Sequence, residues 1–173
     1  MKNRYFLLII ASLFIFFFIV LFKGLQNPNV YTPEIVKGKK ITKFEAIDFF
    51  SNEKVSSFDV LKYKNFYLIN IWASWCLPCR EEHHYLIKLK QQQKIKLIGI
   101  NYKDNFDNAK KFLNDTGNPY TKILKDYNGT VSIQIGAYGV PETFIIDKNN
   151  KIIKKIIGPI DKKIYNEILS IIK

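Results

Sequence analysis

Residues 71–80 read IWASWCLPCR and hold both cysteines of the chain, Cys76 and Cys79. The residues before Ala73 belong to an apolar run, FYLINIW at 66–72, which is typical of a strand buried on both faces. Apolar residues then follow a helical spacing from Cys76 to about Lys90. The sequence therefore predicts a buried strand followed closely by a helix that opens at Cys76.

The Cys-x-x-Cys spacing predicts a redox-active disulfide between Cys76 and Cys79. A disulfide that closes so short a loop adds little stability, so a purely structural role is disfavoured. Two cysteines are also too few for a four-cysteine zinc site. Free N–H groups and the helix dipole favour a thiolate at a helix N-terminus, so we expect a lowered pKa for the Cys76 thiol and assign it the attack on disulfides. Cys79 shares the same helical face and would resolve the mixed disulfide. The pair predicts a thiol–disulfide oxidoreductase.

Glu82 lies on the same helical stripe as Cys79, Leu86 and Leu89. A carboxyl group on an apolar face should have a raised pKa, and it could shuttle the proton of Cys79. The alternative is an acid that stabilises the first turn of the helix, as Glu81 is expected to do.

His83 lies one turn beyond Cys79. Copper accepts two thiolates and an imidazole, so copper delivery to a respiratory oxidase through Cys76, Cys79 and His83 is one alternative function. A helical histidine beside His84 is more often a partly exposed residue with an ordinary role. We therefore predict no metal site and no cofactor.

A second group of candidate residues is GVPET at 139–143. Pro141 stands where a strand is expected to start, a place that tolerates a missing N–H. A cis peptide bond before Pro141 would present the backbone of Val140 to a substrate chain beside the cysteines. Glu142 is either a second active-site carboxylate or a solvated turn acid.

Residues 5–22 contain no charge and would form about 27 Å of helix, close to the thickness of a bilayer core. Lys2 and Arg4 precede them, which favours a cytoplasmic N-terminus. A cleaved signal peptide is the alternative, but no convincing cleavage site follows. We expect a cytoplasmic stub and transmembrane signal-anchor at 1–22, an extracytoplasmic linker at 23–38 and one domain at 39–173.

The formal net charge of +12 raises the question of nucleic-acid binding. The lysines are scattered over the chain and Arg4 and Arg80 are the only arginines, whereas recognition of bases and phosphates favours clustered arginine. We predict no nucleic-acid partner, and a weak attraction to anionic lipid or an acidic partner stays open.

The rest of the chain alternates short elements around an expected mixed sheet, so the fold class is α/β with a central sheet flanked by helices. Strands are predicted within 41–50, 66–72 and 94–100, and a hairpin is predicted to join 143–147 to 151–157. Helices are predicted at 106–114 and 160–173, and Gly117 and Pro119 are expected to end the first of them.

Two stretches resemble the CcmG/DsbE thioredoxin-like proteins of bacterial cytochrome c maturation: residues 72–83, WASWCLPCREEH, and residues 136–147, GAYGVPETFIID. Residues 101–104 and 117–120 are similar to the central segment of that family. The resemblance implies a thioredoxin-like fold with a central insertion.

The resemblance also implies roles for individual residues. Cys76 would be the exposed nucleophile and Cys79 the buried resolving thiol, with a cis Pro141 opposite them. Glu82 and Glu142 match the acidic active-site positions of the family, and substrate is expected to contact Trp75, Val140 and Pro141. Two departures stand out: Asn70 replaces the buried aspartate of ordinary thioredoxins, and Leu77 is unexpected between the cysteines.

The function implied is that of a periplasmic reductant, anchored in the bacterial inner membrane by its N-terminal helix. It would take electrons from a membrane thiol-electron transporter and reduce the haem-attachment cysteines of apocytochrome c, alongside haem-ligation proteins. A general periplasmic thiol oxidoreductase is the other alternative.

Overall fold

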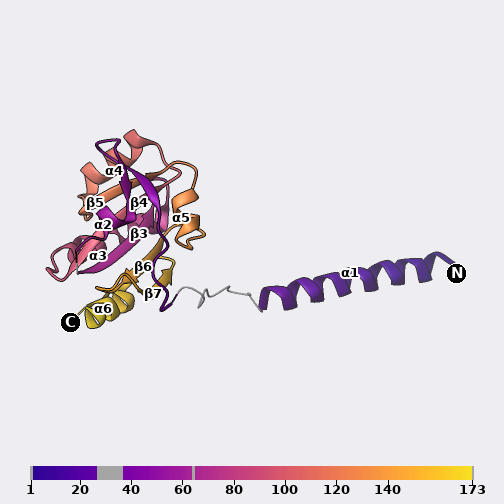
Figure 1. Ribbon diagram of the computed structural model, residues 1–173. Coiled ribbons are helices and arrows are strands. Elements are labelled where there is room, and N and C mark those ends of the chain that lie inside the picture. The colour runs from indigo at the N-terminus through magenta and orange to yellow at the C-terminus, as the bar shows by residue number, and fades with distance from the viewer. Residues whose placement is uncertain (1, 27–36, 64, 173) are drawn as a thin grey trace. The chain divides into compact units, whose positions relative to one another are not determined.

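The computed structural model describes residues 2–26, 37–63 and 65–172, and the chain divides into two units (Figure 1). One contains the helix α1, Lys2–Gln26. Its segment Arg4–Lys23 has a mean hydropathy of 3.0 and exposed side chains. By length and composition this helix could cross a bilayer, as the sequence predicts. Most of the linker predicted at 23–38 lies outside the described residues.

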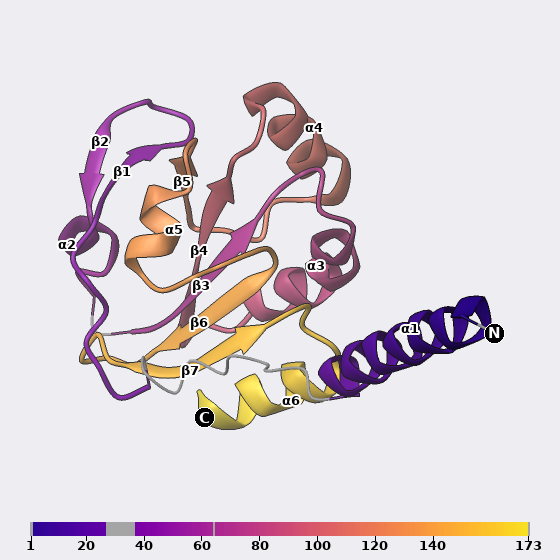
Figure 2. The same ribbon diagram turned by 90° about the vertical axis from the view of Figure 1, so that its right-hand side faces the viewer.

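The second unit is built on a mixed sheet, whose strands within the described residues follow the order β2–β1–β5–β4–β3–β6–β7 (Figure 2). These strands are β1 (Glu45–Asp48), β2 (Lys54–Ser56), β3 (Phe66–Trp72), β4 (Ile95–Tyr102), β5 (Lys122–Asp126), β6 (Glu142–Ile146) and β7 (Ile152–Ile157). β3, β4 and β5 are parallel, and every other neighbouring pair is antiparallel.

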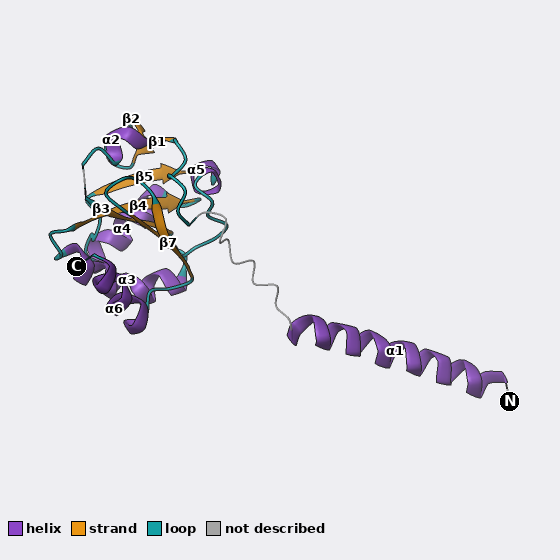
Figure 3. Cartoon of the chain, turned by 60° about the horizontal axis from the view of Figure 1, so that its bottom comes forward, coloured by secondary structure: helices purple, strands orange, loops and turns teal. Residues whose placement is uncertain are grey.

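Helices cover both faces of the sheet (Figure 3). They are α2 (Ser57–Val60), α3 (Leu77–Lys90), α4 (Phe106–Thr116), α5 (Thr130–Gln134) and α6 (Lys162–Ile171). One core contains buried residues of α3, α4 and α6, and the other contains buried residues of α2 and α5. Leu68 of β3 belongs to the first core and Ile69 to the second. β3 is buried on both faces, which explains its continuous apolar sequence.

Local side chains set the ends of the predicted helices and of the hairpin. Cys76 is the N-cap of α3, and Asn105 caps α4 by accepting the N–H groups of Asp107 and Asn108. Gly117 ends α4 with φ at +88°, a conformation that suits glycine. In the turn between β6 and β7, Asp147 Oδ1 accepts the N–H groups of Asn149 and Lys151. The hairpin and the predicted helices are therefore confirmed, with slightly shifted bounds.

Three parts of the sheet differ from the sequence-based expectation, and one of them is the short strand β2, which was not predicted. The strand expected within 41–50 is only Glu45–Asp48, because Asp48 Oδ1 accepts the N–H groups of Phe50 and Ser51 and closes a turn. β5 was not predicted, since its sequence KILKD has one short apolar pair between charged residues. Its Lys125 is nevertheless buried, with Nζ 2.6 Å from Asn52 Oδ1.

Candidate active site

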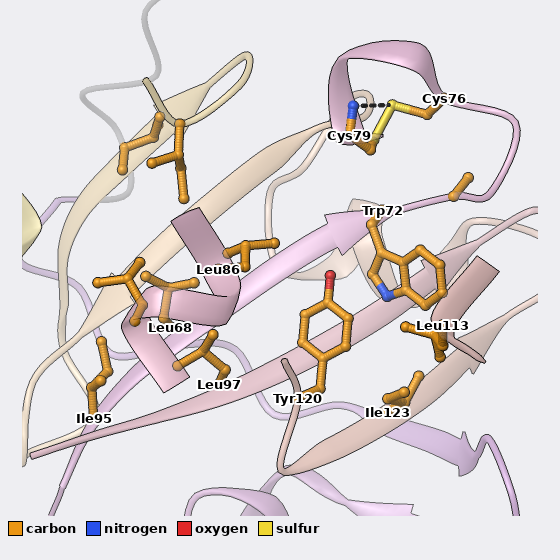
Figure 4. Packing of buried hydrophobic residues seen from close by; sticks show 14 of the residues in the cluster. Leu68, Trp72, Cys76, Cys79, Leu86, Ile95, Leu97, Leu113, Tyr120 and Ile123 are labelled. Carbon is orange, nitrogen blue, oxygen red and sulfur yellow. Dashed lines mark hydrogen bonds between the residues drawn. A yellow bond between two sulfur atoms is a disulfide. The ribbon is translucent and has the colours of Figure 1, made fainter. Parts of the chain in front are cut away.

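Cys76 and Cys79 form a disulfide at the N-terminus of α3, with their Cα atoms 5.3 Å apart. Cys76 Sγ accepts a hydrogen bond from the backbone N–H of Cys79 at 3.1 Å, the contact drawn in Figure 4. Because this N–H belongs to the first turn of the helix, it and the helix dipole stabilise negative charge on the Cys76 sulfur once the disulfide is reduced.

Both cysteines are buried in this oxidised state. The resemblance implies an exposed Cys76, but the residue is 4% exposed and Cys79 is 2% exposed. The expectation of an exposed Cys76 is therefore wrong for the disulfide form, in which both cysteines belong to the buried cluster beside α3. Trp75 and Leu77, on either side of Cys76 in the sequence, have exposed side chains.

The loop that leads from β3 into α3 is fixed by a neighbouring loop. The carboxylate of Asp104 accepts hydrogen bonds from the backbone N–H of Ser74 at 2.5 Å and from its hydroxyl at 2.8 Å. The Arg80 guanidinium donates to the carbonyl of Ser74, and Trp75 Nε1 donates to the carbonyl of Lys103. Sequence reasoning assigned Asp104 and Arg80 no role. Asp104 becomes a neighbour of Ser74 only when β3 and β4 pair, whereas Arg80 contacts Ser74 within the segment that leads into α3.

Glu82 is fully buried one turn after Cys79. Its Oε1 accepts a hydrogen bond from Asn70 Nδ2 at 2.8 Å, and its Oε2 accepts one from the backbone N–H of Ile160, also at 2.8 Å. Burial raises the pKa of Glu82 to about 7, and the two hydrogen bonds partly oppose that rise. Near neutral pH this carboxyl group can therefore either hold or accept a proton.

Asn70 connects Glu82 to a buried tyrosine. Asn70 Nδ2 also donates to Thr143 Oγ1 at 3.0 Å, and Asn70 Oδ1 accepts the hydroxyl proton of Tyr120 at 2.7 Å. Burial, followed by the nearby Glu82, raises the pKa of Tyr120 well above its ordinary value, so its hydroxyl stays a donor. This fixes the amide so that its NH₂ group faces Glu82.

The ring of Tyr120 lies beside that of Trp72, with the ring centres 5.6 Å apart (Figure 4). This packing requires a glycine at position 99 of β4. A Cβ atom there would lie 2.8 Å from Trp72 Nε1 and 2.9 Å from the Tyr120 ring. Gly99, Tyr120 and Asn70 are thus the supports of Glu82 that sequence reasoning missed, although Asn70 was noted as a departure from ordinary thioredoxins.

His83 connects α3 to the end of α4. Its Nε2 lies 2.8 Å from the carbonyl oxygen of Gly117 and 3.1 Å from Thr116 Oγ1. Burial lowers the pKa of the imidazole, and the hydrogen bond with Gly117 opposes that shift. In residues 2–26, 37–63 and 65–172, no three His, Cys, Asp or Glu side chains are grouped so that they could hold a metal.

The second group of predicted residues lies beside the end of β3. The Val140–Pro141 peptide bond is cis, and β6 begins at Glu142, opposite Ile71 of β3. The next pair in the register is Thr143 with Asn70, on the face that carries α3. The structure therefore brings the Val140–Pro141 bond next to the strand that leads to the cysteines.

The side chain of Glu142 lies on one face of the sheet, whereas Glu82 of α3 lies on the other. Side chains alternate along β6, and its next residue, Thr143, bonds to Asn70 on the face that carries α3. Its carboxylate forms an ion pair with Lys155 of β7 at 2.7 Å and accepts the N–H of Tyr138 at 3.0 Å. Lys155 also donates to the carbonyl of Gly136, and both charged side chains are buried. These contacts fix the segment that leads to Pro141, and an active-site role for Glu142 stays a prediction.

The comparisons with known proteins agree with this geometry. Residues 36–169 match the Redoxin family. The chain is 37% identical over 170 residues to the thiol:disulfide interchange protein DsbE of Pasteurella multocida, covering 96% of this chain and 92% of that protein. It is 36% identical to the DsbE protein of Pseudomonas aeruginosa, covering 97% and 92%. The chain belongs to the DsbE family of thiol:disulfide interchange proteins.

Among solved structures, a DsbE protein of Chlorobium tepidum superposes with a TM-score of 0.67 at 23% identity, over 79% of this chain and 98% of that one. This likeness confirms the thioredoxin-like fold. As a DsbE protein, the chain is a thiol–disulfide oxidoreductase, and Cys76 and Cys79 have the spacing and the disulfide that the activity uses.

Proposed function

We propose that this chain is a membrane-anchored reductant of the periplasm, which reduces or resolves disulfides of the haem-attachment cysteines of apocytochrome c. The observation that carries the chemistry is the hydrogen bond from the Cys79 N–H to Cys76 Sγ at the start of α3. This contact supports Cys76 as the attacking thiolate. The choice of apocytochrome c rests on the resemblance of residues 72–83 and 136–147.

In the first step the Cys76 thiolate attacks one sulfur of the substrate disulfide. That bond breaks, the second substrate sulfur leaves as a thiolate, and a mixed disulfide forms on Cys76. In the second step Cys79 gives its proton to the Glu82 carboxylate and attacks Cys76 Sγ. The remaining substrate sulfur leaves, and two electrons have passed to the substrate. The Cys76–Cys79 disulfide described above is the product.

A membrane thiol-electron transporter would return the pair to the dithiol by the reverse exchange. α1 supports the anchor, with residues 1–22 as stub and span, 23–38 as linker and 39–173 as the catalytic domain. Substrate would contact Trp75, which is exposed beside Cys76, and the backbone of Val140 next to Pro141. Glu142 would help to position Val140 and Pro141 for substrate, by holding the 136–141 segment through Lys155.

Trapping tests the proposal. Cys79→Ser should leave Cys76 locked in mixed disulfides, and mass spectrometry of the captured proteins names the substrates. Cys76→Ser is the matched control and should capture none. Capture of apocytochrome c or its assembly proteins supports the proposal, whereas a broad set of unrelated secreted proteins would show a general oxidoreductase instead.

A further inference from the structure

One end of the domain is defined by the starts of the parallel strands. β3, β4 and β5 begin there, and the turn between β6 and β7 lies there too, because β6 runs antiparallel to β3 (Figure 2). Cys76 follows the other end of β3. The two ends of the sheet therefore separate the redox pair from the turn at 147–151.

Lysines gather at the end opposite the cysteines. Six of them, which we call the lysine pole, are Lys39, Lys40, Lys62, Lys96, Lys148 and Lys151. All are exposed apart from the half-buried Lys96. In the part of the chain that the structure describes, no carboxylate forms an ion pair with any of the six.

Aromatic rings lie near three of these ammonium groups, and one acid, Asp59, lies beside Lys62 in the same pocket. Lys96 Nζ lies 3.6 Å and Lys62 Nζ 5.2 Å from the centre of the Tyr63 ring, and the three residues line one pocket of about 280 Å³. Lys148 Nζ lies 5.5 Å from the centre of the Phe66 ring. A cation over a ring keeps its full positive charge.

The carboxylates at this end are engaged in local contacts. Asp147 accepts N–H groups of its own turn, Asp59 bonds to Ser56, and Asp48 pairs with Lys122. The surface around the cysteines differs, because Arg80 and Lys103 there are interspersed with Glu81 and Asp107. The six lysines of the pole thus lie at the end of the sheet away from the redox pair.

The chain also enters the domain at the lysine pole. Gly38 N donates to the carbonyl of Ile152, Ile152 N donates to that of Lys39, and Lys40 forms a bridge with Lys151. The chain from Lys23, the last cation of α1, to Lys37 spans at most about 50 Å even when fully extended. A membrane that holds α1 would therefore hold the lysine pole at high local concentration near its surface.

We propose that the lysine pole docks on the anionic phospholipid surface of the membrane that α1 spans, so that Cys76 faces away from the bilayer. The inference rests on the membrane anchor of the proposed function. Anionic headgroups attract basic clusters within a Debye length. Lysines on long stems suit such a diffuse surface, and the exposed Tyr63 ring among them suits the interface.

Lysine footprinting in nanodiscs tests this docking. The full chain is placed in discs of phosphatidylcholine alone or with phosphatidylglycerol, acetylated briefly at low salt and analysed by mass spectrometry. In anionic discs we expect acetylation of the lysine pole to fall at least threefold and to recover in high salt, while Lys103, Lys110 and Lys162 react equally in both discs. Equal rates at the pole in the two discs, or an equal fall at both ends, would overturn the proposal.

Charge reversal gives the matched variants. Lys148→Glu with Lys151→Glu should remove the protection of Lys62 and Lys96, whereas Lys110→Glu with Lys162→Glu should preserve it; equal protection in the two would contradict the proposal. Thermal melts check that both variants fold. Co-elution of the chain with the discs distinguishes the membrane anchor from the docking of the lysine pole. A chain that fails to co-elute refutes both proposals. A chain that co-elutes but has an unprotected lysine pole refutes the docking alone.

Discussion

Glu82 shows at the residue scale how burial prepares a group for proton transfer. Asn70 and the Ile160 N–H donate to its two oxygens, which favours the carboxylate, while burial favours the acid. The outcome is a pKa of about 7, where both forms are populated at neutral pH. A glutamate exposed to water has an ordinary pKa of about 4.3 and therefore no comparable proton affinity near pH 7.

The first prediction concerns the rate of the resolving step. In the wild type, this rate should rise as pH increases through about 7, because the Glu82 carboxylate becomes available to take the Cys79 proton. Glu82→Gln should lose the rise and slow the step about 100-fold at pH 7.5. Stopped-flow tryptophan fluorescence with a small disulfide measures it. Glu81→Gln is the control, and identical profiles for all three proteins would remove the proton-transfer role.

The second prediction concerns stability. The pKa of Glu82 is raised above the ordinary value of 4.5 to about 7, so between about pH 4.5 and 7 the folded state binds more protons than the unfolded state. The free energy of unfolding should therefore fall across this window as pH rises, by up to about 3 kcal/mol from this group. Glu82→Gln should lack the component and Glu81→Gln should retain it in urea titrations at several pH values. A pH dependence unchanged by Glu82→Gln would contradict the raised pKa.

At the scale of elements, the start of α3 determines the reactivity of Cys76. The third prediction is that, in the reduced Cys79→Ser variant, Cys76 alkylates with an apparent pKa at least one unit below that of an unstructured cysteine, about 8.5. Iodoacetamide rates against pH measure it, and the same variant unfolded in urea is the control. Equal pKa values in the folded and unfolded chain would remove the helix contribution.

The contact between β4 and its neighbours gives the fourth prediction. Gly99→Ala places a methyl group against Trp72 and Tyr120, so we expect a loss of about 1–3 kcal/mol in the free energy of unfolding. Because Tyr120 orients Asn70, the pKa of Glu82 should shift as well. Gly139→Ala is the control, since a Cβ there meets no atom within 4 Å. Equal stability of the two variants in chemical denaturation would contradict the packing argument.

At the scale of the whole molecule, the ion pair of Glu142 and Lys155 joins β6 and β7 to the segment before Pro141. The fifth prediction is that Glu142→Gln, which leaves Lys155 buried without its partner, costs about 3–5 kcal/mol. Glu142→Gln with Lys155→Met should recover much of this loss, because no unpaired charge remains. Denaturation midpoints of the two variants decide the matter. A single variant as stable as the wild type would show that the pair contributes little.

Local sequence alone determined the parts of the fold that a few neighbouring residues specify. The run FYLINIW gave β3 with its observed bounds, because a strand buried on both faces needs apolar residues throughout. Cys76 and Cys79 identified the chemistry by their spacing, and the turn at 147–151 marked the hairpin. The family resemblance added the residues around the cysteines and the Val140–Pro141 bond.

Only the tertiary structure decided where the buried polar groups find partners. Asn70 and Ile160 lie 12 and 78 positions from Glu82 in the sequence, so no local pattern could reveal that they hold its carboxylate. β5 escaped prediction because Lys125 becomes buried only when the rings of Phe49 and Phe106 surround it. Likewise the two candidate carboxylates, Glu82 and Glu142, were separated onto opposite faces by the pairing of β6 with β3. Hydrophobic periodicity is a local property of the chain, whereas the pairing of buried polar groups depends on which distant segments the fold brings together.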